Sequence, residues 1–257
     1  MQKYEIILIY RYFFVFLYAK NEYKPLMDMK RLIFLCALFA AFAANGAAQE
    51  ADSVRHEVLF ETTMGNIRVV LYNETPRHRD NFLKLVGEGF YDGNLFHRVI
   101  ADFMIQTGDS TTRHAKPGET VGLHSPDYTV PAEIVFPKYF HKRGALAAAR
   151  EGDAANPERA SSASQFYIVY GTNYSSLSLD RFQERLDQAT GGTVKLTEDI
   201  RDYYRKYGGT PHLDGQYTVF GEVVEGLDVV RKINYVQTDD YARPVDDVRI
   251  VKATVVK

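Results

Sequence analysis

Alternating apolar and polar residues dominate the chain from Val54 onward and predict short strands separated by turns. In the stretch HEVLFETTMGNIRVVLYN, the alternation holds on both sides of Met64-Gly65, which predicts a β-hairpin. Five later stretches show the same strand-like composition and predict a mainly β chain. They are AEIVF, GALAAA, QFYIVYG, YTVFGEVV and VRIVKATVV.

The period becomes helical in the stretch TPRHRDNFLKLVGEGF. Phe82 and Val86 fall on one face, and Thr75 followed by Pro76 suits a capped first turn. A second short helix is predicted over residues 227–233. Many strands with two well-separated helices predict a closed antiparallel barrel whose ends are covered by helices.

Residues 172–210 interrupt the β pattern with two helical stretches. In SLSLDRFQERLDQATGG, Leu179, Phe182 and Leu186 share one face. The second stretch, KLTEDIRDYYRKYGGTP, opens with Thr197 and acidic residues and closes with basic residues and a glycine pair, as the helix dipole favours. Because about 40 residues are too few for an independent core, we predict a helical hairpin inserted into the β scaffold.

The N-terminal 48 residues are set apart from the fold. From Met29, the sequence MKRLIFLCALFAAFAANGAAQEA has a basic start, an apolar run and small residues before Gln49, as a secretory signal peptide does. The run is short for a transmembrane span, which needs about 20 residues. We interpret residues 29–48 as a signal peptide that directs the protein to the periplasm or outside the cell. Residues 1–28 are interpreted as a mis-called upstream extension, with a membrane anchor as the alternative.

Composition and charge narrow the possible partners. The chain is 46% hydrophobic and 25% charged, with a net charge of −2, and removing the six basic and three acidic residues of 1–48 leaves −5. This balance argues against nucleic acid and against a membrane surface as partners of the mature domain. The single cysteine, Cys36, lies before the domain, and the seven histidines form no metal-binding motif. We therefore expect no disulfide, no metal and no cofactor.

One stretch, FHRVIADFMIQTGD, places Arg98 and Gln106 within an otherwise apolar run. A charge in apolar surroundings is costly unless it is paired or used. Together with SSASQFYIVYG and PHLDGQYTVFGEVVEGLDVV, this stretch resembles the cyclophilin-type peptidyl-prolyl cis/trans isomerases. The three separated blocks occur in the family's order, and the resemblance covers about residues 56–257 apart from the segment 172–210.

The resemblance implies a fold and a site within residues 54–257. The fold is a closed eight-stranded antiparallel barrel with two capping helices, here carrying the inserted helical hairpin, and an outer groove holds a proline peptide. Arg98 matches the family's catalytic arginine, while Gln106 and Gln165 match glutamines that bind the peptide backbone and orient that arginine. Nine further residues match positions that contact the substrate. They are Phe103, Met104, Ala149, Arg150, Tyr167, His212, Leu213, Tyr217 and Phe220.

The chemistry of proline isomerisation suits these residue types. The peptide bond resists rotation by ~18–20 kcal/mol because the nitrogen lone pair is delocalised. No bond is broken, so the reaction needs no nucleophile, metal or general base. A guanidinium can hydrogen-bond the prolyl nitrogen once the twisted bond localises its lone pair. His97, beside Arg98, is interpreted as a packed structural histidine, because isomerisation requires no proton transfer.

Three positions depart from the family pattern. Arg150 stands where Asn is common, but the contact there is expected through the main chain, so we expect binding to persist with altered preference for neighbouring residues. His212 stands where many members have Trp, which puts sensitivity to cyclosporin in doubt. Tyr217 replaces a frequent His. The last two replacements resemble those of bacterial members.

We therefore interpret the chain as an exported bacterial isomerase of this type. We expect a monomer that acts on proline-containing peptides and on unfolded or folding proteins, with segment 172–210 flanking one end of the groove and modulating access. Tyr203, Tyr204 and Tyr207 are predicted to pack against the barrel rather than to form a partner-binding patch. A proline-peptide-binding chaperone with vestigial catalysis remains an alternative. A ligand-carrying barrel is disfavoured by the bulky residues of the interior strands.

Overall fold

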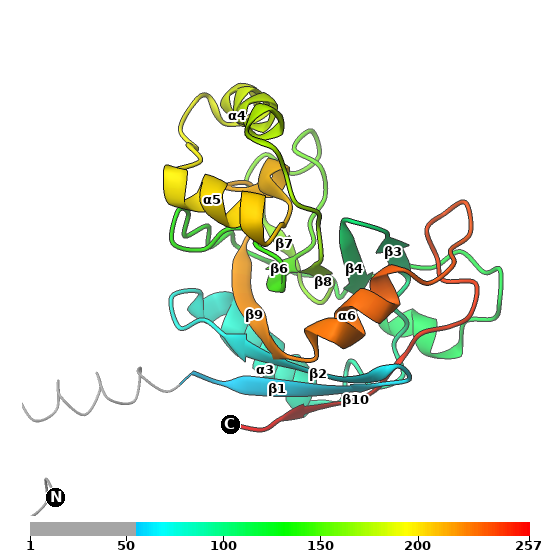
Figure 1. Cartoon of the computed structure of the whole chain (residues 1–257). Helices are drawn as coiled ribbons and strands as arrows, with labels where there is room; N and C mark the ends of the chain where they lie inside the picture. The colour runs from blue at the N-terminus through cyan, green and yellow to red at the C-terminus, as the bar shows by residue number, and fades with distance from the viewer. Residues whose placement is uncertain (1–54) are drawn as a thin grey trace, which may run out of the picture. The chain divides into compact units, whose positions relative to one another are not determined.

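The computed structural model describes residues 55–257, and its first element is the predicted hairpin (Figure 1). β1 (Glu57–Thr62) and β2 (Gly65–Leu71) pair antiparallel, with Thr62 opposite Gly65. Gly65 has a φ of 127°, a conformation that glycine adopts without strain. The hairpin prediction is confirmed. The interpretations of residues 1–28 and 29–48 concern segments that lie outside the described residues.

Eight strands form one antiparallel sheet in the order β10-β1-β2-β9-β6-β8-β4-β3. The remaining six follow the hairpin along the chain. They are β3 (Arg98–Ile100), β4 (Met104–Thr107), β6 (Ala145–Ala148), β8 (Phe166–Val169), β9 (Val219–Glu225) and β10 (Ile250–Val255). The strand predictions for GALAAA, QFYIVYG, YTVFGEVV and VRIVKATVV are therefore confirmed.

The sheet is a half-barrel, and the predicted closed ladder is not observed because β3 and β10 remain edge strands. The segment before β3 contains Gly89 and Gly93, both with positive φ. Next to β10 this segment forms one isolated bridge, between Leu95 and Arg249. Backbone hydrogen bonds still connect the two edges. They run from Gly93 N to Ile250 O (2.7 Å), from Phe96 N to Val248 O (2.9 Å) and from Ile250 N to Asn94 O (2.9 Å).

Residues 132–136, the stretch AEIVF, form no strand, so that prediction is wrong. The short strand β5 (Thr129–Val130) ends before this stretch and pairs with β7 (Ser161–Ser162) in a second sheet. The stretch is diverted because Glu133 binds the start of α3 (Pro76–Gly87). Its carboxylate accepts hydrogen bonds from Arg77 N (3.1 Å) and His78 N (3.0 Å). Glu133 therefore replaces the predicted cap Thr75, whose hydroxyl donates to the Tyr72 carbonyl.

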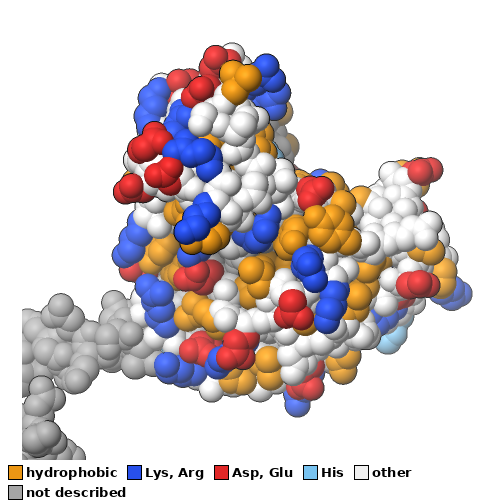
Figure 2. All heavy atoms as spheres, viewed as in Figure 1, with side chains coloured by type: hydrophobic (Ala, Val, Ile, Leu, Met, Phe, Trp, Pro, Cys, Tyr) orange, Lys and Arg blue, Asp and Glu red, His pale blue; other side chains and the backbone are white. Residues whose placement is uncertain are grey.

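The other three helices are α4 (Ser176–Thr190), α5 (Glu198–Lys206) and α6 (Leu227–Asn234). The side chain of Thr197 caps α5, as predicted, and Leu179 and Leu186 of α4 are fully buried. In Figure 1, α4 and α5 stand together beyond β6 and β9, and Figure 2 shows charges of both signs on their outer side. Among the described helices, none combines the length and the apolar character that crossing a membrane requires.

Strand alternation divides the apolar residues into an inner and an outer layer. On β8, Phe166 and Ile168 join the inner core, whereas Tyr167 and Val169 join a cluster on the other face. The inner core is sealed by α3 and α6, which supply Phe82 and Val230. The predicted capping role of these two helices is thereby confirmed.

Phe166 is central to the inner core, and we expect Phe166→Ala to destabilise the domain by about 3–5 kcal/mol. Its ring contacts Phe60, Phe82 and Tyr91 at centroid distances of 5.7, 5.2 and 5.3 Å, so truncation leaves a cavity that these rings cannot fill. Chemical denaturation measures the loss. The control Tyr241→Ala removes a ring that is 89% exposed and should change stability by less than about 0.5 kcal/mol; equal losses in both variants would contradict the assignment.

Candidate functional site

A row of paired residues crosses five strands on the outer face of the sheet. Arg98 of β3 lies opposite Gln106 of β4, Gln106 opposite Tyr167 of β8, Tyr167 opposite Ala147 of β6, and Ala147 opposite Val219 of β9. Directly opposed residues share a face of the sheet. The register thus brings the predicted Arg98, Gln106 and Tyr167 together.

A chain of hydrogen bonds fixes the orientation of Arg98. Gln165 Nε2 donates to the carbonyl oxygens of Gly122 and His124, both at 3.0 Å, so its Oε1 faces Gln106. Gln106 Nε2 then donates to Gln165 Oε1 (3.0 Å), and Gln106 Oε1 accepts from Arg98 Nη1 (3.0 Å). Carbonyls only accept and a guanidinium only donates, so each amide has one orientation that satisfies its neighbours.

The apolar part of the site is the cluster beside Arg98, called the outer apolar cluster below. The Arg98 guanidinium carbon lies 6.0 Å from the centroid of the Phe103 ring, and its Nη1 lies 3.9 Å from Met104 Sδ. The cluster combines buried residues with half-buried ones that pack on them. The buried residues are Tyr72, Met104, Ala145, Ala147, Tyr167, Val169 and Val219, and the half-buried ones are Ile100, Phe103, Tyr139, Ala149, Leu213 and Tyr217.

Arg98 is half-buried, and this partial burial lowers its pKa, while the nearby hydroxyls of Tyr217 and Tyr167 raise it. An arginine remains charged throughout the pH range in which proteins fold. Within the described part of the chain, Nη1 is the only guanidinium nitrogen of Arg98 that bonds to another residue. Arg98 therefore presents N–H donors, at a fixed angle, beside an apolar surface.

His212 connects this surface to α4. It lies in the short helix η2 (Pro211–Leu213), with its ring 5.3 Å from that of Phe103 and 5.8 Å from that of Phe182 on α4. Burial lowers the pKa of His212 to about 4, with His141 and Arg185 acting in the same direction. The neutral ring therefore serves as an aromatic spacer, and α4 borders the outer apolar cluster.

Arg150 supports the site from behind through its side chain. Its guanidinium carbon lies 4.3 Å from the centroid of the Tyr217 ring, Nε donates to the Gln216 carbonyl (3.0 Å), and Nη1 pairs with Asp153 (2.6 Å). The side chain is only 2% exposed. A direct side-chain contact with a ligand is therefore excluded in this conformation, and the sequence-based expectation of a main-chain contact still stands as a prediction.

Phe220 was predicted to contact the substrate, but the structure places it in the inner core, away from the site. It is 3% exposed and belongs to the inner core, 5.3 Å from Phe82 between ring centroids. Its neighbour Val219 occupies the outer face, opposite Ala147. The alternation within YTVFGEVV predicts that Val219 and Phe220 lie on different faces, because successive residues of a strand face opposite sides.

Seven residues of the outer apolar cluster were not anticipated, and two of them, Ile100 and Tyr139, are half-buried at its surface. Ile100 lies two positions after Arg98 on the same strand, so the period of β3 could have identified it. Tyr139 stacks on Tyr72 with centroids 3.8 Å apart. It lies in a loop 33 residues after Gln106 along the chain, and no local pattern in the sequence indicates that position.

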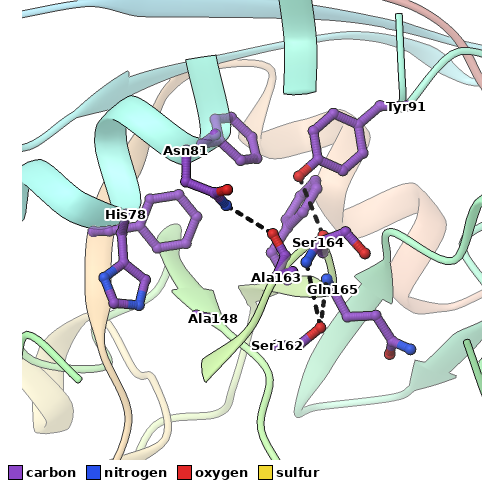
Figure 3. Close-up of a pocket in the computed structure, with 11 residues that line it drawn as sticks. His78, Asn81, Tyr91, Ala148, Ser162, Ala163, Ser164 and Gln165 are labelled. Carbon is purple, nitrogen blue, oxygen red and sulfur yellow. Dashed lines mark hydrogen bonds between the residues drawn. The ribbon is translucent and has the colours of Figure 1, made fainter. Parts of the chain in front are cut away.

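A small cavity behind Gln165 shows how the main chain of this segment is held (Figure 3). Asn81 Nδ2 donates to the Ala163 carbonyl (2.7 Å), Tyr91 donates to the Ser164 carbonyl (3.2 Å), and Gln165 N donates to Ser162 Oγ (3.0 Å). The Gln165 side chain points away from Asn81 and Tyr91. These lining residues thus hold the backbone of residues 163–165 in place, and the side-chain amide of Gln165 is free to bond Gln106.

His97 is 5% exposed, which confirms its assignment as a packed residue. Burial lowers its pKa to about 4, opposed by the nearby Asp109 and assisted by Arg98. Its Nδ1 has no hydrogen-bond partner among the described residues. In residues 55–257 no group of three or more His, Cys, Asp and Glu side chains is arranged to hold a metal ion.

Comparison with known proteins gives the same family that the three sequence blocks resemble. Residues 57–255 match the family model described as cyclophilin type peptidyl-prolyl cis-trans isomerase/CLD. A peptidyl-prolyl cis-trans isomerase of Dictyostelium discoideum is 32% identical over 198 residues, covering 77% of this chain and 96% of the relative. A putative peptidyl-prolyl cis-trans isomerase of Staphylococcus aureus is 33% identical over 205 residues, covering 79% and 92%.

Solved structures share the fold at lower identity. A cyclophilin type peptidyl-prolyl cis-trans isomerase of Cryptosporidium parvum superposes with a TM-score of 0.55 at 23% identity, covering 79% of this chain and 99% of that protein. A second structure of the same protein, determined in the presence of the dipeptide Ala-Pro, gives a TM-score of 0.54 at 23% identity, covering 78% and 99%. At this identity the likeness establishes the fold.

The depressed pKa of His97 predicts acid sensitivity. A histidine whose pKa is lower in the folded state than its usual 6.5 stabilises the fold fully above pH 6.5 and loses that contribution as pH falls toward about 4. The loss attributable to His97 is on the order of 3 kcal/mol. We expect the free energy of unfolding, measured by urea denaturation between pH 6.5 and 4, to fall less steeply in His97→Asn than in the wild type.

The exposed His114 provides the matched control for that titration, because His114→Asn changes a histidine outside the core. It should keep the wild-type slope. Since His212 has a similarly lowered pKa, His97→Asn should reduce the slope without abolishing it. A His97→Asn profile parallel to that of the wild type would show that His97 does not carry the effect.

Proposed function

Because this chain belongs to the cyclophilin-type peptidyl-prolyl cis-trans isomerase family, we propose that Arg98 and the outer apolar cluster catalyse X–Pro rotation in proteins that fold after export. The substrates of this family are proline-containing peptides, in keeping with the Ala-Pro dipeptide used with the Cryptosporidium enzyme. We assign the proline ring to the half-buried rim formed by Phe103, Leu213 and Tyr217 over Met104.

The observation that carries this proposal is the fixed guanidinium beside an apolar surface. Rotation about the X–Pro bond localises the lone pair of the prolyl nitrogen, which then accepts a hydrogen bond that the planar amide cannot accept. A donor that binds this nitrogen only in the twisted state lowers the barrier, because the interaction is stronger in the transition state than in the ground state. Gln106 holds one nitrogen of Arg98, so the remaining N–H groups are already oriented before a peptide binds.

No covalent step is needed in this mechanism, and none is proposed. The side chains around Arg98 are glutamine, methionine, phenylalanine and tyrosine. Burial raises the pKa of Tyr167 well above its ordinary value, so its hydroxyl stays protonated and neutral. The proposed contribution of the protein is thus one of binding, orientation and electrostatic stabilisation.

Arg98→Ala tests the mechanism. We expect kcat/KM for a proline peptide to fall about 100- to 1000-fold, the usual effect of removing one preorganised donor, while peptide affinity changes by less than about tenfold. A protease-coupled isomerisation assay and peptide titration measure the two quantities. Arg77→Ala, an exposed arginine at the start of α3, should match the wild type in both.

The same variant separates catalysis from the chaperone alternative. If Arg98→Ala still prevents aggregation of an unfolded protein and supports function in cells at wild-type level, the binding role is the relevant one. If isomerisation itself survives in Arg98→Ala, the catalytic proposal is wrong.

Export is proposed from the sequence of residues 29–48, which resembles a signal peptide. N-terminal sequencing of protein recovered from the periplasm or the culture medium should give a start close to Gln49. Recovery of the protein in the membrane fraction with residues 1–28 attached would instead support the membrane-anchor alternative. A bacterial source is proposed from His212 and Tyr217, which resemble the replacements found in bacterial members.

A further inference from the structure

A buried hydrogen-bonded chain connects α5 to the outer apolar cluster. Tyr204 of α5 donates to Asp214 Oδ2 (2.8 Å), His141 Nδ1 lies 3.0 Å from Asp214 Oδ1, and His141 Nε2 lies 3.0 Å from the hydroxyl of Tyr167. Tyr204, Asp214 and His141 are fully buried, and Tyr167 is 5% exposed. Four polar side chains from four parts of the sequence thus satisfy one another inside the protein.

The direction of each hydrogen bond follows from the chemistry of the groups. The Asp214 carboxylate only accepts, and it receives the backbone N–H of His141 (2.8 Å), the Nδ1–H of His141 and the hydroxyl of Tyr204. In the tautomer that places the ring proton on Nδ1, His141 Nε2 is an acceptor, and we assign the Tyr167 hydroxyl as its donor. Burial raises the pKa of both tyrosines well above the ordinary value, which keeps both hydroxyls protonated as this arrangement requires.

The two ends of the chain lie in different clusters. Tyr204 packs with Leu179, Leu186 and Ile200 in the core of segment 172–210. Tyr167 belongs to the outer apolar cluster and lies opposite Gln106 in the sheet. Loss of any link leaves a buried polar group unpaired, which is more costly than the bond itself is favourable. The chain therefore transmits the position of α5 to the residue beneath the site.

We propose that Tyr204 is a positioning residue for isomerisation, acting through Asp214 and His141 on Tyr167. This inference rests on the proposed function, since it assigns segment 172–210 a role at the same site. The hydroxyl bond to His141 fixes the tilt and depth of the Tyr167 ring, which lies beneath the rim to which the proline is assigned. The segment thereby adjusts catalysis through a buried connection, in addition to its contact through Phe182 and His212.

A double-mutant cycle tests this coupling. Tyr204→Phe keeps the ring but removes the donor, and we expect kcat/KM to fall about fivefold, the effect of one hydrogen bond. In a Tyr167→Phe background the chain is already cut at the site, so adding Tyr204→Phe should change kcat/KM by less than twofold. Tyr203→Phe is the matched control, because Tyr203 lies on the same helix outside the chain, and it should equal the wild type in both backgrounds.

Two further measurements keep the test decisive. His141→Gln interrupts the chain in the middle and should also suppress the effect of Tyr204→Phe. ¹⁵N NMR of His141 in the wild type should show the Nδ1–H tautomer, with the Nε2 signal shifted by Tyr204→Phe, a change that a purely structural role of Tyr204 would not produce. Denaturation of each variant verifies that it remains folded under the assay conditions.

The outcomes distinguish this inference from the proposed function. If isomerisation requires Arg98 but Tyr204→Phe has no effect, or has the same effect in both backgrounds, the positioning role is wrong and the proposed function stands. If the wild-type protein shows no Arg98-dependent isomerisation, the proposed function and this inference fall together.

Discussion

The direction of the Arg98 guanidinium depends on an amide relay that ends at a buried carboxylate. Gln165 is oriented by the carbonyls of Gly122 and His124, and the backbone N–H groups of these same two residues donate to Asp109 (2.9 and 3.2 Å). Burial opposes the charge of Asp109, yet the hydroxyl and N–H of Thr111 and these backbone donors lower its pKa. The loop that contains Gly122 and His124 therefore helps to determine how the short strand β3 presents its arginine.

The period-two alternation of the central strands allows the folded domain to keep apolar residues at its surface in addition to those of its buried core. The inner layer takes Leu146, Phe166, Ile168 and Phe220 and carries the stability of the domain, while alternate positions form the outer apolar cluster. Because each layer uses its own set of residues, a substitution in the outer apolar cluster changes the polarity or shape of that surface and leaves the side chains of the inner core in place.

Much of this arrangement follows from local sequence patterns, and the exceptions have long-range causes. The hairpin, the four helices and four of the five later strands were predictable because period and turn residues act over a few positions. Strand 132–136 was mispredicted because Glu133 binds the start of α3, 55 residues earlier in the sequence. The site residues came from motif resemblance, and Phe220 was misplaced where that resemblance overrode strand alternation. His141 had no local signal, since Asp214 lies 73 residues away.

The entry and exit of segment 172–210 meet at one point of the fold. Gly209 N donates to the Thr172 carbonyl (3.2 Å), and Gly209 also bridges to Lys142, while Thr210 N donates to the His141 carbonyl (2.9 Å). A tight turn could join the two ends without displacing any strand. A change in the length of this segment would therefore leave the strand register in place, and both ends of the segment lie next to His141, the histidine that contacts Tyr167. The junction thus couples the length of the excursion to the surroundings of Tyr167.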